Sequence, residues 1–425
     1  MQTRVTPSRL PFHYGWLIVA AGGLVLFACF GLARYAYAML LPGMQAGLGL
    51  SYDRLGLIGT ANFCGYLVSV VLAPYALRRF RPRPLIVCGL ALIGLALLLI
   101  SRSTSFWQLA ILYTLAGAGG GFANIPLMLV VTYWFHRAQR GKALGLVLGG
   151  NGAGIVLAGQ LMPFLNRLYG ADGWRAGWLV LGTACLAAGG IVALVLRNSP
   201  AELGLEPIGP PERCEPDQFV SHERQQAGSI VLRLGLVYLA FGATFMIYGT
   251  FIVTSMVREY GLTELAAGRY WSWVGLCSLV SGVLFGGLSD RIGRRSGLAL
   301  VLVVQTVAYL LVGFRLGGLW LTLSIVLYGL ALFAIPTIMT AAIADYLGLA
   351  RAASSFATVT LFFAAGQVVG PGLAGMLGRA SGTFSGAYLL AAVVTQLACG
   401  CAWSLPRIDA GRAVAGKTET EARQQ

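Results

Sequence analysis

An arginine lies inside a long apolar stretch near the start of the chain, and it is the residue best suited to binding chemistry. Residues 16–41 are almost entirely hydrocarbon, enough to cross a bilayer of about 30 Å as a helix, and Arg34 is their only full charge. An arginine in mid-membrane costs at least ~2.5 kcal/mol on insertion scales, so such residues usually face a polar cavity. We therefore expect Arg34 to line a cavity and bind an anion, since its paired N–H donors suit a carboxylate.

The depth of Arg34 in the membrane depends on where its helix ends. If the helix continues through Pro42 to about Gln45, Arg34 lies near the bilayer midplane. If the helix stops at Leu41, Arg34 lies in the outer half, and its side chain can reach water at the membrane surface. A cavity-facing arginine is the prediction, and a surface-reaching or purely structural arginine is the alternative.

The remaining polar residues at membrane depth are neutral. None of the 15 acidic residues and none of the 3 histidines lies in the middle of an apolar segment, although a proton or cation pathway normally needs such a group. An amide in hydrocarbon needs a hydrogen-bond partner, and one cation among amides favours a bound anion. The candidate substrate-binding amides are Asn62, Asn124, Asn151 and Gln367.

The composition is that of an integral membrane protein. Of the 425 residues, 57% are hydrophobic and 11% are charged, whereas soluble domains carry about 25% charged residues. Apolar segments of spanning length occur twelve times, which predicts an all-α membrane protein. These segments cover residues 14–45, 54–77, 84–101, 106–134, 142–165, 174–196, 230–257, 264–288, 296–314, 319–343, 353–377 and 383–405.

A polar, proline-rich stretch divides the twelve segments into two sets of six. A stretch of this kind is too polar to span a membrane and too rich in proline for one long helix. A six-plus-six layout suggests duplication, as in transporters built from repeats. We predict an N-terminal six-helix bundle at residues 14–196, a cytoplasmic linker at 197–229, a C-terminal six-helix bundle at 230–405 and a cytoplasmic tail at 406–425.

The distribution of Lys and Arg predicts the orientation. With both termini on one side, the loops on that side hold most of the 30 Lys and Arg residues, and the opposite loops hold a minority. By the positive-inside rule, the protein is a multi-pass protein of the cell (inner) membrane with cytoplasmic N- and C-termini. The same rule accounts for the net charge of +15, so the lipid bilayer is the expected environment and no nucleic-acid partner is expected.

The most specific string lies between the eighth and ninth apolar segments. Residues 286–295 read GGLSDRIGRR and resemble the G-x-x-x-D-R-x-G-R-R loop signature of the major facilitator superfamily. Its glycines allow a tight turn, its aspartate can pair with arginine or cap a helix, and its basic run holds the loop in the cytoplasm. The equivalent loop of the first half has Arg78 in place of the aspartate. The candidate gating-loop residues are Gly286, Asp290, Arg291, Gly293, Arg294 and Arg295.

Weaker strings resemble the monocarboxylate-transporter and oxalate–formate-antiporter side of this superfamily. They lie at residues 13–16, 140–145, 173–175 and 199–204, and the resemblance covers about residues 13–405. It implies two pseudo-symmetric six-helix bundles, with the first and seventh spans often facing the central axis. On that basis Tyr35, Tyr37, Tyr248 and Trp273 are further candidate substrate-binding residues, with packing as the alternative for each.

Glycine-rich stretches occupy equivalent places in the fifth and eleventh segments, at residues 145–159 and 366–375. The second stretch resembles a glycine–proline pattern associated with antiporters, but in that family the pattern belongs to the fifth segment. We therefore expect these glycines to serve close packing of helices.

The residues favour a secondary active transporter that moves a small organic anion, with a carboxylate as the expected class, by alternating access. The alternative is a proton-coupled exporter of drugs or other hydrophobic compounds, for which Glu264 or Asp345 at a segment end could carry the proton. No nucleotide-binding or zinc-protease motif is present, so neither an enzyme nor a cofactor or metal site is expected. A monomer is expected, while the direction of transport and the choice between symporter and antiporter stay open.

Overall fold

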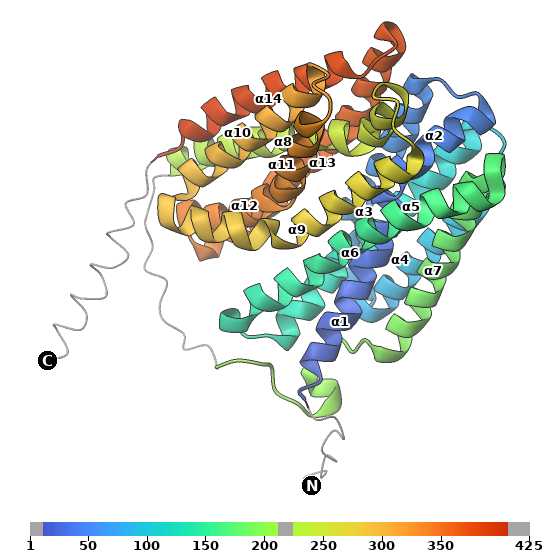
Figure 1. Ribbon diagram of the computed structural model, residues 1–425. Helices are drawn as coiled ribbons and strands as arrows, with labels where there is room; N and C mark the ends of the chain where they lie inside the picture. Colours follow the sequence, from blue (N-terminus) through green and yellow to red (C-terminus); the bar gives the residue numbers. More distant parts are fainter. Residues whose placement is uncertain (1–11, 211–223, 407–425) are drawn as a thin grey trace, which may run out of the picture.

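The computed structural model describes residues 12–210 and 224–406, which form helices joined by short turns (Figure 1). The first half contains α1 (Gly15–Leu26), the π-helix η1 (Phe27–Tyr35), α2 (Tyr37–Leu48), α3 (Tyr52–Arg79), α4 (Pro82–Ile100), α5 (Phe106–Trp134), α6 (Arg137–Tyr169), η2 (Gly170–Asp172), α7 (Gly173–Val195) and η3 (Pro200–Leu203). The second half contains α8 (Arg224–Arg258), α9 (Glu264–Ile292), α10 (Arg294–Gly313), α11 (Leu319–Ala331), α12 (Ala334–Leu347), α13 (Leu349–Ser381) and α14 (Ser385–Trp403).

These helices make twelve crossings of membrane length. Among the described residues, 11 helical stretches are long and apolar enough to cross a membrane. The longest, Gln139–Val195, reverses at the 3-10 turn η2 and therefore contains two crossings, α6 and α7. In contrast, α1, η1 and α2 together form one crossing, and α11 and α12 form another. The twelve crossings correspond to the twelve apolar segments of the sequence.

Local sequence signals explain where several helices begin and end. The hydroxyl oxygen of Ser105 accepts a hydrogen bond from the backbone N–H of Gln108 at the start of α5, and Thr263 caps α9 through Ala266 in the same way. Helix α2 ends at Gly49, whose φ of 61° lies in the left-handed region that glycine adopts without strain. Each of these signals comes from a residue next to the end of the helix that it caps.

Large aromatic side chains fill the interior of each half. In the first half Trp134, Trp174 and Trp178 are almost fully buried. In the second half four buried tyrosines pack together with ring-centre distances between 4.1 and 6.4 Å; they are Tyr248, Tyr309, Tyr328 and Tyr388. The candidate site lies between these two packed interiors.

The two halves touch through glycines at two helix crossings. Where α6 crosses α9, a Cβ added to Gly275 would lie 2.7 Å from the carbonyl oxygen of Gly152. Where α3 crosses α13, a Cβ on Gly56 would overlap the carbonyl oxygen of Pro371. Only glycine permits such a close approach of two backbones. The glycine-rich stretches in α6 and α13 thus have the packing role expected from the sequence.

Polar contacts also join the halves at one end of the bundle. Helix α3 contributes Asp53, which pairs with Arg379 of α13 at 2.9 Å. Helix α9 contributes Glu264, whose carboxylate accepts a hydrogen bond of 2.7 Å from Asn166 of α6. We call the end of the bundle where α1 begins and α14 finishes the basic end. The other end, where these contacts lie, is called the opposite end. These contacts close the opposite end between α3 and α13 and between α6 and α9, and a cavity of about 660 Å³ lies beside them between α2, α6, α8 and α9.

At the basic end the facing helices of the two halves diverge. In α6, no atom lies within 4 Å of the position that a Cβ on Gly145 would take. In α9, Val283 is 79% exposed. Figure 1 shows the basic ends of α6 and α9 lying apart. The halves therefore meet through these contacts at the opposite end, and their facing helices diverge at the basic end.

The described part of the predicted linker, residues 197–210, follows the basic end of the first half. The N–H of Ile208 donates to the carbonyl of Trp134, and the N–H of His136 donates to the carbonyl of Ile208, both at 2.9 Å. Linker residues 211–223 and tail residues 407–425 lie outside the described residues, so the predicted boundaries there stay predictions.

Candidate substrate site

A π-helix positions Arg34 in the first crossing. The helix runs on through Pro42 to Leu48, so Arg34 lies near the middle of the 34-residue crossing and not at its end. The nine residues of η1 have the wider turns of a π-helix, which are frequent at functional sites. The hydroxyl of Tyr113 donates to the carbonyl of Ala33 at 3.0 Å and so supports this part of η1 from α5.

Three aromatic rings surround the guanidinium of Arg34. Its Cζ lies 4.5 Å from the ring centre of Phe30, 4.7 Å from that of Phe63 and 4.6 Å from that of Tyr66. Phe30 belongs to η1, and the other two rings belong to α3. We call these three rings the aromatic cage. Each ring face carries partial negative charge, so the cage stabilises the cation without neutralising it.

The charge of Arg34 has no carboxylate partner in the described part of the chain. No ion pair or hydrogen bond joins its guanidinium to residues 12–210 or 224–406, and its Nε is buried without an acceptor. A buried charge is normally paired, because burial without a partner costs free energy. An uncompensated guanidinium of this kind is suited to an anion that comes from outside the chain.

Arg34 lines a small cavity between the two halves. The cavity volume is about 10 Å³, close to the space of one water molecule. One wall comes from the first half and the other from α8. The lining residues are Arg34, Tyr35, Tyr37, Ala38, Gly59, Asn62, Phe63, Tyr113, Met246, Gly249 and Thr250. Four of the predicted substrate-binding residues, Arg34, Tyr35, Tyr37 and Asn62, therefore meet at one place.

Two of these four residues are held by backbone carbonyls. The hydroxyl of Tyr37 donates to the carbonyl of Leu55 at 2.7 Å, and Nδ2 of Asn62 donates to the carbonyl of Tyr113 at 3.0 Å. The Oδ1 of Asn62 is buried and has no hydrogen-bond donor among the described residues. Asn62 thus offers an acceptor at the cavity, while Tyr37 is oriented mainly by its bond to α3.

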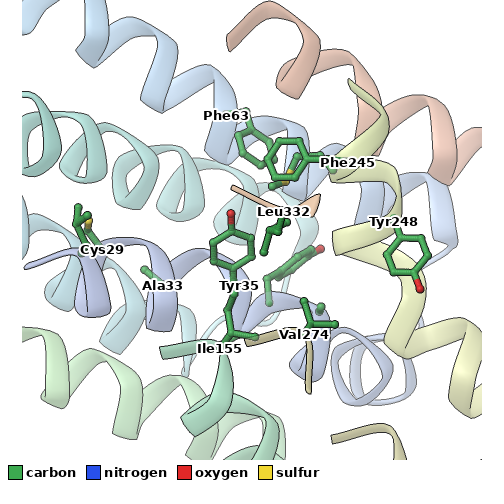
Figure 2. Packing of buried hydrophobic residues seen from close by; sticks show 14 of the residues in the cluster. Cys29, Ala33, Tyr35, Phe63, Ile155, Phe245, Tyr248, Val274 and Leu332 are labelled. Carbon is green, nitrogen blue, oxygen red and sulfur yellow. The ribbon is translucent and has the colours of Figure 1, made fainter. Parts of the chain in front are cut away.

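Tyr35 reaches across to the second half. Its ring lies 6.5 Å from that of Phe333 in an edge-to-face arrangement. Figure 2 shows Tyr35 close to Leu332 and Phe245, with Phe63 beside them. Tyr35 therefore forms part of the contact between the halves near the centre of the bundle.

The other predicted amides lie outside the cavity lining. Nδ2 of Asn124 donates to the hydroxyl of Tyr66 at 3.2 Å, so Asn124 orients a ring of the aromatic cage. Asn151 and Gln367 are both buried, and each has a side-chain carbonyl oxygen without a partner among the described residues. The backbone carbonyl of Asn151 lies against Gly31 of η1. Their substrate contacts stay predictions.

Tyr248 and Trp273 are corrections to the predicted cavity lining. Tyr248 is fully buried in the tyrosine cluster of the second half, where its hydroxyl is hydrogen-bonded to Ser324 at 2.9 Å. Figure 2 shows it pointing away from Tyr35, whereas Phe245 of the same helix points inward. Trp273 is 55% exposed on the outer face of α9, next to the exposed Leu276 one helical turn away. It faces the surroundings of the bundle and not the cavity.

The aromatic cage is not evident from the sequence pattern. The spacing of Phe30 and Arg34 is i, i+4, which places them on one helix face and could have suggested a contact. Phe63 and Tyr66 have the i, i+3 spacing of a shared face, but nothing in their spacing indicates that this face meets Arg34. Their role depends on the packing of α3 against η1.

We expect Tyr66→Leu to destabilise the protein and Tyr66→Phe to have a smaller effect. Leucine removes one ring of the cage, and a desolvated cation–π contact contributes about 1–2 kcal/mol. Phenylalanine keeps the ring and loses only the hydrogen bond from Asn124. Thermal unfolding of the full chain in detergent measures both variants. Equal melting temperatures for the leucine variant and the wild type would contradict the cage.

The predicted gating loop forms an ion-pair cluster at the basic end of the second half. Arg294, the first residue of α10, pairs with Asp290 of α9 and with Asp345 of α12, the latter at 2.6 Å. The guanidinium of Arg295 lies 4.4 Å from the ring centre of Trp403. The contacts of this loop thus join α9, α10, α12 and α14. The turn itself lies at Gly293, whose φ is 89°.

Removing both carboxylates should cost more stability than removing Arg294. The side chain of Arg294 is only 18% exposed, so Asp290→Asn with Asp345→Asn leaves a largely buried charge unpaired. That loss should destabilise the protein by about 2 kcal/mol, whereas Arg294→Gln removes the charge itself and should cost about 1 kcal/mol. Thermal unfolding of both variants tests this order, and the reverse order would contradict it.

Comparison with known proteins agrees with this architecture. A bacterial homolog of the human lysosomal transporter Spinster, solved in an inward-facing and occupied conformation, superposes with a TM-score of 0.72 at 17% identity and covers 92% of this chain and 96% of its own. The human monocarboxylate transporter 2 is 21% identical over 410 residues, 90% of this chain and 84% of that protein. A probable hexose phosphate transport protein of Chlamydia pneumoniae is 25% identical over 289 residues.

The fold and the matches define a membrane transporter of the major facilitator superfamily, and the predicted twelve-helix fold is confirmed. Within this superfamily the chain belongs to the family described as uncharacterised MFS-type transporter YbfB, whose model matches residues 26–402. The match to the chlamydial protein covers 61% of that protein's length. This chain thus spans less than two thirds of the length of the first relatives that it matches. The matches thus point to a family of transporters and not of enzymes, as the sequence indicated.

Proposed function

We propose that this protein is a secondary active transporter of a small organic anion, with a carboxylate as the preferred class. The observation that carries the proposal is the guanidinium of Arg34, which lies at the interface of the two halves without a carboxylate partner among the described residues. A carboxylate would supply the missing charge and would accept two parallel N–H bonds. Asn62, Tyr35 and Tyr37 line the same cavity.

Alternating access would expose this site to each side of the membrane in turn. The halves meet at the opposite end and diverge at the basic end, which is one of the two conformations that such a cycle needs. We infer that the basic end faces the cytoplasm of the cell and that the protein lies in the inner membrane, because cationic loops are retained on that side. The observed conformation would then be open to the cytoplasm.

The charge of the site favours a monoanion. Arg34 is the one cationic side chain among the residues that line the cavity. A relative named for hexose phosphate and a relative named for monocarboxylate are both similar to this chain. A dianionic phosphate group would need a second cation for full compensation, whereas a monocarboxylate needs one. We therefore place monocarboxylates ahead of sugar phosphates.

Ligand-induced thermal stabilisation of the purified full chain tests this proposal. The panel contains aliphatic and aromatic monocarboxylates, glucose 6-phosphate and the lipophilic cation tetraphenylphosphonium. We expect a rise in melting temperature with at least one monocarboxylate and no rise with the cation. Stabilisation by the cation alone would overturn the anion proposal.

A proton-coupled exporter of hydrophobic compounds is the second candidate. The observation in its favour is Glu264, a partly buried carboxylate that joins α9 to Asn166 of α6 at the closed end. Protonation of this carboxylate would weaken a contact between the halves and could couple a proton to opening. Export of tetraphenylphosphonium from proteoliposomes driven by a pH gradient, and lost in Glu264→Gln, would establish this candidate.

A further inference from the structure

Another cavity lies at the basic end of the first half, between the start of α4 and the end of α7. Its volume is about 710 Å³, and its lining includes Arg81, Arg83, Cys88, Arg197, Asn198 and Glu202. All of its lining residues belong to the first half, so it is separate from the cavity between the halves.

Two of its arginines are fixed by the last turn of α7. Nη1 of Arg197 donates to the carbonyls of Leu194 and Leu196 at 2.9 and 3.1 Å, and Nη2 of Arg83 donates to the carbonyl of Ala193. Cations at a helix C-terminus satisfy its free carbonyls and complement its dipole. A guanidinium has five N–H donors, so each of these two retains donors for a ligand.

The positive charge of the cavity is only partly compensated. Glu202 is the one carboxylate in its lining, and it lies 3.6 Å from Arg81 and accepts a 2.7 Å hydrogen bond from Asn198. Three guanidiniums thus face a single carboxylate. The side chain of Arg81 is 79% exposed and can turn toward a ligand. A net positive cavity of this kind favours an anion with several acceptor oxygens.

The two halves differ in how far acidic side chains compensate the arginines of their basic-end loops. In the second half, Asp290 and Asp345 neutralise Arg294 of the equivalent loop. In the first half, Arg78 takes the place of the aspartate and stacks 5.5 Å from the ring centre of Tyr75. The first-half loop therefore lacks the aspartate that pairs with an arginine in the second-half loop.

An apolar strip continues from the cavity along the membrane-facing side of α4. Cys88 at the cavity is exposed, and Leu95 and Leu99, which are 54% and 56% exposed, follow it on the same helix face. The end of α7 adds Leu194, which is 75% exposed. A basic cavity at the end of a membrane-spanning helix, followed by exposed hydrocarbon, matches the two parts of a phospholipid.

We propose that this cavity binds the headgroup of an anionic phospholipid. Arg81, Arg83 and Arg197 contact the phosphate oxygens, and the acyl chains lie along the strip formed by Leu95 and Leu99. The proposal is independent of the substrate at Arg34. A lipid held here joins the start of α4 to the end of α7 and stabilises the basic end of the first half.

Native mass spectrometry of the delipidated full chain tests this site. The probes are phosphatidylglycerol, phosphatidylcholine and inorganic phosphate, each titrated separately. We expect phosphatidylglycerol to bind more tightly than phosphatidylcholine and inorganic phosphate to compete weakly. Arg81→Gln combined with Arg197→Gln should weaken phosphatidylglycerol binding about 25-fold, since each arginine near the membrane surface contributes about a fivefold effect.

A matched control variant distinguishes lipid binding at this cavity from a general effect of surface charge. Arg291→Gln combined with Arg351→Gln removes two exposed arginines from the basic end of the second half and should leave phosphatidylglycerol binding unchanged. Glu202→Gln removes the competing carboxylate and should strengthen binding. Equal losses in the two double variants, or equal affinity for phosphatidylcholine, would overturn the proposal. Inorganic phosphate that competes as strongly as the lipid would make this a free-phosphate site instead.

Discussion

Replacing Arg34 by glutamine should abolish thermal stabilisation by any monocarboxylate that the wild type recognises. It should also abolish transport of that monocarboxylate. Truncating one partner of a desolvated, hydrogen-bonded charge pair costs about 3 kcal/mol, which corresponds to roughly 100-fold weaker binding. The loss should be large because Arg34 is the one cation in the cavity lining, so no neighbouring charge can replace it. Thermal stabilisation and uptake into proteoliposomes measure the two effects.

The same variant should leave the stability of the ligand-free protein nearly unchanged. An arginine at membrane depth costs at least ~2.5 kcal/mol, and the three rings of the aromatic cage, at about 1 kcal/mol each, stabilise it by about 3 kcal/mol. These two contributions nearly cancel, so removing the charge removes both. A structural arginine would behave differently, because its loss would lower the melting temperature without any ligand present.

Two further variants test whether the effect is specific to the guanidinium of Arg34. Arg34→Lys keeps the charge but loses the paired donors, and it should retain binding that is weakened about tenfold. Arg54→Gln is the matched control, because Arg54 also lies near an aromatic ring, 5.9 Å from that of Phe106, but is exposed at the opposite end. Unaltered monocarboxylate binding by Arg34→Gln would contradict the proposed site.

The sequence predicted the crossings because they follow from short-range patterns, but it left two depths open for Arg34, since that depth depends on where the helix ends. Segment length and apolar content determine where a helix can span, and a single charge in such a segment has few stable positions. The π-helix η1 could not be predicted, because no residue pattern distinguishes it from an α-helix. The pairing of Phe63 and Tyr66 with Arg34 depends on how α3 packs against η1, which is a long-range property.

The errors at Tyr248 and Trp273 have a common physical cause. A helix that is apolar on every side can face lipid or protein with any part of its surface, so periodicity does not determine its rotation about its axis. The resemblance indicated which helices face the centre but not which residues on them do so. On α8 the inward-facing residues include Phe245 and Met246, whereas Tyr248 is turned into the second half.

Substituting the glycines at the crossings between the halves should hold the opposite end open. A Cβ on Gly56 would overlap the backbone of Pro371, and a Cβ on Gly268 would overlap the carbonyl oxygen of Gly159. Backbone atoms cannot move aside as a flexible side chain can, so Gly56→Val or Gly268→Val should destabilise the closed opposite end by about 3 kcal/mol. A shift of that size changes the ratio of two conformations about 100-fold.

The distance between spin labels at Leu168 and Leu319, two exposed positions at the opposite end of different halves, reports this change. We expect a longer distance in Gly56→Val and Gly268→Val than in the parent chain without native cysteines, together with loss of transport. Gly190→Val is the control, because a Cβ at Gly190 of α7 would meet no atom within 4 Å. An unchanged distance with full transport in both variants would mean that the halves do not need these close crossings. The glycines would then serve folding alone, and the closed end would depend on the polar pairs at Asp53 and Glu264.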